Sequence, residues 1–597
     1  MNVTAQPPKL LKYLLGAIIA LIILIPLWTL FVMAVIQPNS LMMQEQTMGN
    51  RLWWWIAGPV AAVGLAFGGR WMAATQHAQA SEQQSRAHVQ VNAQHVAATG
   101  QTRNEYVLEV IGLGVTLDQY RQGKLWEALQ NGSPYVTIRE QDAKKYPWSD
   151  QDKAGTSGGR SGDTLENGAQ YTPMYYGVPV FNAEAPMFNP KMADKPNDPR
   201  SGLAEGATLS GMAWHLFVAG PRRFEERPDR ILEDVFAFFD AHPDVPYVVL
   251  NSDDSMDFHD FNRPPNGPRL LKDGYYIPEM PDSSALFVLA RRERVDPVRP
   301  FVWDDPDNDF LQNTLRWMYY TLKQSVPHPE RKEITRTPAQ VGADPTQLLP
   351  NEGPSRTPLV SEWLEAAAAF ATRPDVRGTG LTHVLDGVNP LVHRPPKDWR
   401  PTPWFPVPWN REQLATFDKL PTLGYIHRPT FVKFSDANGQ PLTRRDEREK
   451  ALQAGWQEAL RTLPEAERAK APARIIAATG GNSSQTIALH SLLTDQAAHG
   501  GPEIDSGKSS QFIDTDKRLG NTGAATLFVQ MAIGVMGSYR DGGISAAVNL
   551  RDTNEASIVF ISPPSDEKRK TQKHPKGGDV FAHRGTPAID PANYPSN

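Results

Sequence analysis

The sequence predicts an α/β protein of two similar halves, each built from layered sheets and helices, behind an N-terminal hairpin of two transmembrane helices. Three observations support this prediction. Strand-like and helix-like segments alternate in both halves of the chain, which is typical of layered α/β folds. Hydrophobic residues make up 40% of the 597 residues, as expected of a folded protein with large cores. Two long apolar runs lie near the N-terminus.

The composition excludes several classes of function. The net charge is −5, whereas a nucleic-acid-binding protein usually carries a basic surface. The chain contains no cysteine, so it can form neither disulfides nor thiolate metal sites and cannot use a cysteine nucleophile. We therefore expect no nucleic-acid partner and no cysteine chemistry.

The two apolar runs predict a membrane anchor over residues 1–72. The first run, 13–36, has no charged residue and is long enough to cross a hydrocarbon core of about 30 Å as a helix. The second, 52–69, is shorter and opens on tryptophans, which favour the membrane–water interface. Lys9 and Lys12 precede the first run and an arginine follows the second, which places both ends of the hairpin in the cytoplasm.

Two alternatives for the anchor stay open. The first run could be a cleaved signal peptide, and the second could be a helix that lies on the membrane surface. If the second run does not span the membrane, the large domain lies on the opposite side. With both spans in place, we expect a protein of the bacterial inner membrane whose large domain is cytoplasmic.

A polar stalk and a first α/β lobe follow the anchor. Residues 73–104 are rich in Ala, Gln and Ser and predict the stalk. The N-terminal lobe is expected over 105–324, and its middle, 139–205, is polar and rich in Gly and Pro, as loops are. Apolar runs and helical periodicity predict strands at 106–115, 247–250 and 284–290, and helices at 125–130, 232–241 and 309–324.

A Pro-rich connector over 325–420 leads to a second lobe at 421–564, where strands and helices alternate again. The tail, 565–597, is basic and then Pro-rich, and we expect it to be mobile. The elements predicted in this half are strands at 423–434, 474–478, 544–549 and 557–561, and helices at 360–371, 442–463, 484–493 and 524–538.

Three stretches carry a resemblance to a known fold. They are YVLEVIGLGVT at 106–116, LWEALQNG at 125–132 and KRLGNTGAA at 517–525. These stretches resemble the thiolase-like fold of condensing enzymes such as ketosynthases. The resemblance implies a pseudo-duplicated body of two stacked α/β lobes.

The same resemblance implies that the chemistry of the condensing enzymes is missing. The family that these stretches resemble works through a cysteine nucleophile and, in ketosynthases, through two histidines as well. This chain has no cysteine, has Asn521 where the closing motif has histidine, and reads Ala-Ala-Thr-Gly at 477–480 where the family has Ala-His-Gly-Thr. We therefore expect Thr479, Gly480 and Asn521 to mark a degenerate pocket in a pseudo-enzyme that uses no cofactor and no metal.

Other segments are similar to the type VI secretion lipase-adapter family. They are the apolar N-terminal segment, the tract 171–179, the run 284–292, and the closing stretches 542–552 and 562–564. This resemblance implies a non-catalytic adaptor that binds a secreted phospholipase effector and loads it on the spike of the secretion machine. The implied partners are the lipase effector, a spike protein and, through the N-terminal helices, the inner membrane.

The connector contains an aromatic segment, PTPWFPVPW at 401–409. Alternating prolines keep such a backbone extended and leave no repeating apolar period. Two interpretations of Trp404, Phe405 and Trp409 are open. Either they pack back on the body of the protein, or they form an exposed aromatic patch that binds the partner.

An alternative function is a membrane-tethered acyl-binding or serine-dependent hydrolytic enzyme. Ser157 lies in a Gly-x-Ser-x-Gly pattern at 155–159, but a nucleophile elbow needs a preceding strand, and 149–153 is polar. We expect a flexible loop there. Acidic residues crowd 253–260 and 304–309, and they lack the spacing of a calcium-binding loop. We interpret them as solvated turns and helix caps.

Overall fold

The computed structural model divides the chain into two compact units, Met1–Gly100 and Gln101–Asn597, and every described residue belongs to the second. The predicted membrane spans, the stalk, the helices at 309–324 and 360–371, and the tail beyond 583 lie outside the described residues. Within the part of the chain that is described, no helix is long and apolar enough to cross a membrane. The described residues are 106–148, 153–173, 178–184, 197–198, 203–205, 216–223, 227–261, 263, 267–302, 398–399, 405 and 408–583.

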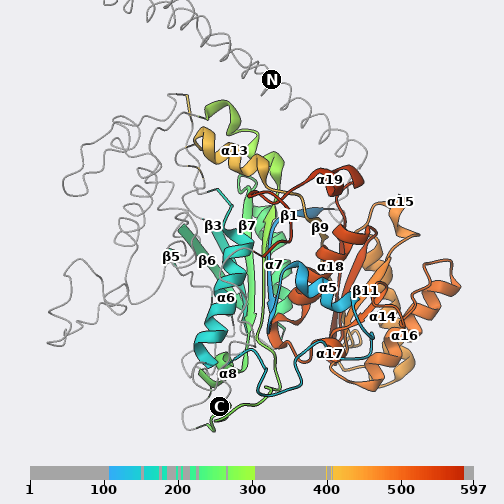
Figure 1. Cartoon of the computed structure of the whole chain (residues 1–597). Coiled ribbons are helices and arrows are strands. Elements are labelled where there is room, and N and C mark those ends of the chain that lie inside the picture. The colour runs from blue at the N-terminus through green and yellow to red at the C-terminus, as the bar shows by residue number, and fades with distance from the viewer. Residues whose placement is uncertain are drawn as a thin grey trace, which may run out of the picture. The chain divides into compact units, whose positions relative to one another are not determined.

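The first lobe contains the described strands and helices that the apolar runs predict, with small changes at their ends (Figure 1). Its helices are α5 (Gly123–Gln130), α6 (Lys153–Ala169), α7 (Ile231–Ala241) and α8 (Met256–Phe261), with 3₁₀ turns η3 (Pro228–Arg230), η4 (Arg292–Val295) and η5 (Arg299–Phe301). Its strands are β1 (Val107–Leu117), β2 (Tyr120–Arg121), β3 (Val178–Glu184), β4 (Asn197–Asp198), β5 (Leu203–Glu205), β6 (Leu216–Arg223), β7 (Tyr247–Asp254) and β8 (Ser283–Ala290).

The second lobe also follows the prediction, except that the strand expected at 423–434 is divided in two. Pro429 lies at the break, where it has no N–H to donate to a strand neighbour. The strands are β9 (Gly424–His427), β10 (Thr430–Lys433), β11 (Arg474–Ala478), β12 (Phe512–Asp514), β13 (Ser545–Asn549) and β14 (Glu555–Ser562). The helices are α13 (Arg411–Lys419), α14 (Arg445–Leu460), α15 (Glu465–Arg468), α16 (Ser483–Ala498), α17 (Thr515–Arg518), η6 (Gly523–Ala525), α18 (Thr526–Asp541) and α19 (Asp566–Thr571).

The strand order confirms that the two lobes are duplicates of one another. The main strands lie in the order β6-β3-β7-β8-β1 in the first lobe and β12-β11-β13-β14-β9 in the second. Numbered along the chain within each lobe, both orders read third, second, fourth, fifth, first. In both lobes the fifth strand is antiparallel to its two neighbours and the third and fourth are parallel to the second. Antiparallel pairing of β1 with β9 joins the lobes.

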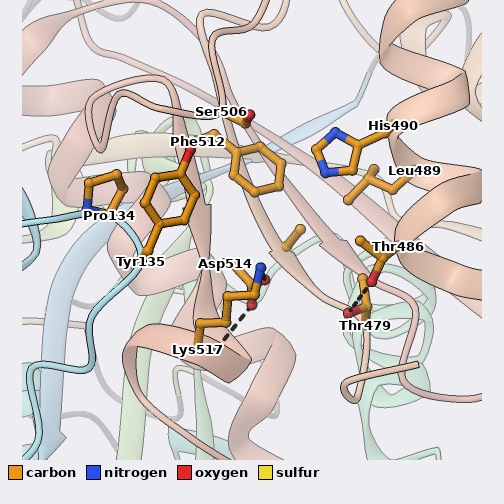
Figure 2. Close-up of a pocket in the computed structure, with 11 residues that line it drawn as sticks. Pro134, Tyr135, Thr479, Thr486, Leu489, His490, Ser506, Phe512, Asp514 and Lys517 are labelled. Carbon is orange, nitrogen blue, oxygen red and sulfur yellow. Dashed lines mark hydrogen bonds and ion pairs between the residues drawn. The ribbon is translucent and has the colours of Figure 1, made fainter. Parts of the chain in front are cut away.

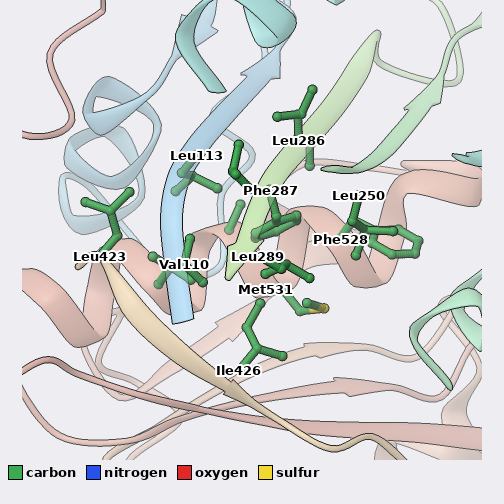
Figure 3. Packing of buried hydrophobic residues seen from close by; sticks show 14 of the residues in the cluster. Val110, Leu113, Leu250, Leu286, Phe287, Leu289, Leu423, Ile426, Phe528 and Met531 are labelled. Atoms are coloured by element: carbon green, nitrogen blue, oxygen red, sulfur yellow. The ribbon is translucent and has the colours of Figure 1, made fainter. Parts of the chain in front are cut away.

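Helix α18 forms the centre of the core. It is apolar on all sides, and 14 of its 16 residues are buried, as expected of a helix enclosed between two layers. Phe528 and Met531 on this helix pack beside Leu250 and Leu289 of the first lobe and Ile426 of the second (Figure 3). The helix therefore ties the two lobes into one core.

The strands of the second lobe are buried on both faces. Along β14, Ile558 and Phe560 belong to a cluster with Trp456 of α14, while Val559 and Ile561 belong to the cluster around α18. Successive side chains of a strand point to opposite faces, so a strand covered on both sides is apolar throughout. This burial explains why these strands are recognisable in the sequence as continuous apolar runs.

Helix α6 corrects the expectation that 139–205 consists of loops. It packs against β1 through glycines on both elements. A Cβ placed on Gly114 would overlap the carbonyl oxygen of Thr164, and one placed on Gly112 would overlap that of Gly168. The close approach depends on Gly112 and Gly114 of β1 and on Gly168 of α6, whereas Gly158, Gly159 and Gly162 of α6 have open space where a Cβ would lie.

The tail also differs from its prediction, because it is packed from Ser565 to 583. The hydroxyl of Tyr539 donates to the carbonyl oxygen of Arg569 at 3.2 Å. Phe581 is 2% exposed and its ring meets that of Tyr539 edge-on. The mobile-tail expectation is therefore wrong for the described residues of the tail.

Candidate functional site

The predicted residues Thr479 and Gly480 lie directly after β11, at the edge where three parallel strands end. Strands β12, β11 and β13 are neighbours and parallel, so their carboxyl ends share this edge. Ligand sites of open α/β sheets commonly form at such an edge. Gly480 has φ of +65°, a conformation that favours glycine, and turns the chain into α16.

The backbone donors of this turn are occupied by a side chain of the same lobe. Asp516, on α17, accepts from the N–H of Thr479 at 2.6 Å and from that of Gly480 at 2.7 Å. Burial raises the pKa of Asp516, while Arg551 at 3.6 Å and the two N–H groups act to lower it. An anion from solution would have to displace this carboxylate.

A hollow of about 50 Å³ opens beside the turn (Figure 2). Its wall combines one segment of the first lobe with the strand ends, α16 and α17 of the second. The lining residues are Pro134, Tyr135, Ala477, Thr479, Thr486, Leu489, His490, Ser506, Phe512, Asp514 and Lys517.

The hollow has aromatic and apolar walls and polar groups whose charges are paired. Figure 2 shows Tyr135 on one side, His490 on the other and Phe512 between them; the rings of His490 and Phe512 stack with centroids 5.6 Å apart. Lys517 forms an ion pair with Asp514 at 3.3 Å. The hydroxyls of the two lining threonines are 3.2 Å apart. The site can therefore accept an apolar group without leaving a charge unpaired.

Asn521 does not line this hollow. Its side chain is exposed and accepts from the N–H of Gly523 at 2.9 Å within its own loop. The loop leads to the start of α18, where Asp254 accepts from the N–H of Ala524 at 2.7 Å. The structure thus separates the predicted pocket residues: Thr479 lines the hollow, and Asn521 belongs to the loop before α18.

Asp254 is held in place by a histidine. The Nε2 atom of His259 lies 2.8 Å from its carboxylate, and this interaction raises the pKa of His259. A carboxylate at the start of a helix interacts favourably with the helix dipole and with N–H groups that have no partner within the helix. The start of α18 is therefore filled by groups of the protein itself.

The equivalent helix of the first lobe, α7, also begins at a cluster of charges. Arg227, just before η3, contacts Asp229 at 2.9 Å, Glu555 at 2.6 Å and Asp552 at 3.3 Å. Arg230 makes a second ion pair with Glu555. Sequence reasoning missed this cluster, because its members come from segments more than 300 residues apart.

The acidic residues near 253–260 are partly buried and do not form the expected solvated turn. Asp253 is half-buried in β7, and its burial together with neighbouring Asp254 raises its pKa to about 7. Asp260 accepts from the backbone N–H of Leu270. Among the described residues, no group of three or more His, Cys, Asp or Glu side chains is arranged to hold a metal ion.

Ser157 lies on helix α6, so the flexible loop expected there is wrong. Its hydroxyl donates to that of Ser255 at 3.0 Å, and its side chain is buried. A nucleophile elbow presents its serine on a sharp turn between a strand and a helix, whereas this serine lies inside a helix. The pattern at 155–159 is therefore not such an elbow.

The described aromatic residues of the connector are buried, which favours the interpretation that they pack on the body. Phe405 is 2% exposed and Trp409 1% exposed, and their rings meet edge-on. Trp409 also contacts Phe417 of α13, with ring centroids 5.3 Å apart. An exposed patch made of Phe405 and Trp409 is thus wrong, because the core encloses both rings. Trp404 lies outside the described residues.

Two family models match the chain, one on each lobe. Residues 106–273 match the model "Type VI lipase adapter protein Tla3, N-terminal", and residues 423–563 match the corresponding C-terminal model. Together these segments make up just over half of the chain.

Solved structures with a similar course of the chain include ketosynthases. The ishigamide ketosynthase/chain length factor is 9% identical, with 77% of this chain and 100% of that chain covered and a TM-score of 0.35. OleA from Xanthomonas campestris is 11% identical, with 77% and 98% covered and a TM-score of 0.31. A ketosynthase of the bacillaene synthase from Bacillus subtilis 168 is 6% identical, with 77% and 71% covered and a TM-score of 0.34. Likeness at this level is too weak to transfer any chemistry.

Proposed function

Because the chain belongs to the type VI lipase adapter family, we propose that it binds a secreted lipase effector and loads it on the secretion spike without catalysis of its own. The observation that carries this proposal is the match of both adapter models, one to each lobe of a single folded unit. The lobes are joined through β1 and β9 and share the central helix α18. The adapter is therefore expected to work as one body.

Two features support a role without catalysis. The chain has no cysteine, and a serine or threonine hydroxyl needs an adjacent base to act as a nucleophile. Carboxylates lie just before α7 and α18, where a nucleophile would profit from the helix dipole: Asp229 precedes α7 in an ion pair with Arg227, and Asp254 accepts from the N–H of Ala524 before α18. We therefore propose that the body is a pseudo-enzyme.

We further propose that the protein is anchored in the bacterial inner membrane, with its large domain in the cytoplasm. The support is the charge-free run at 13–36, the second run at 52–69 and the basic residues outside the two runs. Fusions of a reporter that is active only in the periplasm would test it. We expect a reporter fused in the loop between the two runs to be active and a reporter fused at the C-terminus to be inactive. An active reporter at the C-terminus would overturn the proposed orientation.

Binding is tested by capture of the full-length chain from cells that also express the lipase effector encoded beside it. We expect the lipase in the eluate, and the spike protein only when the lipase is present. An eluate without lipase, from cells that contain both proteins, would overturn the adaptor proposal.

Catalysis is tested with a chromogenic acyl ester. We expect the purified chain to hydrolyse it no faster than buffer does. Hydrolysis that disappears in Ser157→Ala would restore the enzymatic alternative.

A further inference from the structure

Most of the large apolar side chains that are exposed among the described residues belong to the segments that form the hollow. Four large apolar side chains are exposed among the described residues: Tyr135 (62%), Val136 (59%), Phe261 (85%) and Ile487 (42%). Tyr135 lines the hollow and Val136 follows it in the chain. Ile487 stands on α16 between the lining residues Thr486 and His490, one turn away from the histidine. Three of the four thus flank one small hollow, and we call Tyr135, Val136 and Ile487 the apolar rim.

The segment that carries Tyr135 is held firmly although it is a loop. The backbone N–H of Ile138 donates to the carbonyl oxygen of Arg518 at 2.9 Å, and the hydroxyl of Thr137 donates to the same oxygen at 3.0 Å. Arg518 is itself 1% exposed. On the other side, α16 is fixed by leucines such as Leu489 in the core of the second lobe. A surface that is ordered before binding loses less conformational entropy when a partner docks.

The charges around the hollow indicate the kind of group that it accepts. Lys517 is paired with Asp514, and Lys508 is paired with Asp505, each at 3.3 Å. These pairs leave no excess charge that would attract a phosphate or a nucleic acid. A volume of about 50 Å³ is also far below the 300–1,000 Å³ or so of pockets that enclose whole small molecules. The hollow therefore suits the end of one uncharged side chain.

We infer that the apolar rim and its hollow form the surface on which the lipase effector docks, with the end of one apolar or aromatic side chain of the effector inserted into the hollow. This inference rests on the proposed adaptor function. Tyrosine is among the residues that most often dominate the energetics of a protein interface. The ring of Tyr135 and the side chain of Ile487 would exclude water from around the inserted side chain.

The test measures the affinity of the full-length chain for the purified lipase effector by a surface-binding assay. Tyr135→Ala and Ile487→Ser are compared with Phe261→Ala, which removes the fourth exposed apolar side chain, on α8, an element that does not line the hollow. We expect each rim variant to raise Kd by about tenfold or more and the double variant to raise it further, as truncation of a central interface residue does. Phe261→Ala is expected to leave Kd unchanged.

The three side chains are exposed, so their removal should leave the thermal unfolding midpoint within a degree or two of the wild-type value. If the wild type binds the lipase and both rim variants bind it with the same Kd, this inference is wrong and the adaptor proposal still stands. Loss of spike capture with lipase capture intact would also overturn it, because the surface would then serve the other partner. No binding by the wild type would overturn the adaptor proposal, and this inference with it.

Discussion

Replacement of Trp409 by alanine separates the two interpretations of the aromatic connector. The side chain is 1% exposed and packs between Phe405 and Phe417. An aromatic side chain of this size buries about 150–250 Å², which at about 25 cal/mol per Å² corresponds to roughly 4–6 kcal/mol. Measured losses for Trp→Ala in cores are about 3–5 kcal/mol, because the surrounding structure relaxes in part. We expect a loss in this range in the free energy of unfolding.

The assay is urea unfolding of the full-length chain, followed by tryptophan fluorescence and circular dichroism, with the slope of the transition unchanged. Trp409→Phe is the matched control. It keeps most of the ring, and the indole N–H that it removes has no hydrogen-bond partner among the described atoms. The control is expected to cost less than about 1.5 kcal/mol. A loss below about 1 kcal/mol for Trp409→Ala, together with weaker capture of the lipase, would show that this ring is exposed in solution and that the reasoning is wrong.

Three further predictions follow from close contacts and from one half-buried acid. Gly114→Ala should lower the free energy of unfolding by about 1–3 kcal/mol, because the new methyl group overlaps the carbonyl oxygen of Thr164. The control Gly159→Ala, on the open face of α6, should be neutral or stabilising. Equal effects of the two substitutions would contradict the close packing of α6 on β1. Gly523→Ala should cost about 2–4 kcal/mol in urea unfolding, since its φ is +54° and its Cβ would overlap a buried carboxylate, and a neutral result would contradict this geometry. The folded pKa of Asp253, about 7, lies above its ordinary value of 3.8, so between these pH values the folded state binds more protons and stability falls as the pH rises. Asp253→Asn should remove this pH dependence and be more stable than the wild type above pH 7. The measurement is urea unfolding of both proteins at pH 5 and pH 8. If the free energy of unfolding changes by the same amount in both proteins between these pH values, the pKa of Asp253 is not raised.

The sequence predicts most of the described framework because burial on both faces leaves a local pattern. Strand β8 is buried at every position and α18 at almost every position, so both appear as uninterrupted apolar runs. Helix α6 lacks such a pattern. Its glycines weaken helical propensity, and the helix gains its stability from a close approach to β1, which no local window of sequence contains.

The candidate site is less predictable for the same reason. Thr479 could be placed from a motif, because a turn after a buried strand leaves a local pattern. Tyr135 could not be recognised, because it is an ordinary loop tyrosine until Arg518, more than 380 residues away, fixes its segment beside α16. For Trp409 the sequence left two interpretations open, because a proline-rich segment has no apolar period from which its burial could be predicted. In each case the information lies in contacts between distant parts of the chain.

The hollow also explains why the two lobes should act together. Pro134 and Tyr135 come from the first lobe, and the other lining residues come from the second. Neither lobe alone presents both walls. Charged side chains of the protein lie just before α7 and α18, the equivalent helices of the two lobes, whereas Pro134 and Tyr135 form the first-lobe wall of the hollow. A partner that docks at the hollow would therefore depend on how one lobe packs on the other rather than on a reactive group within either lobe.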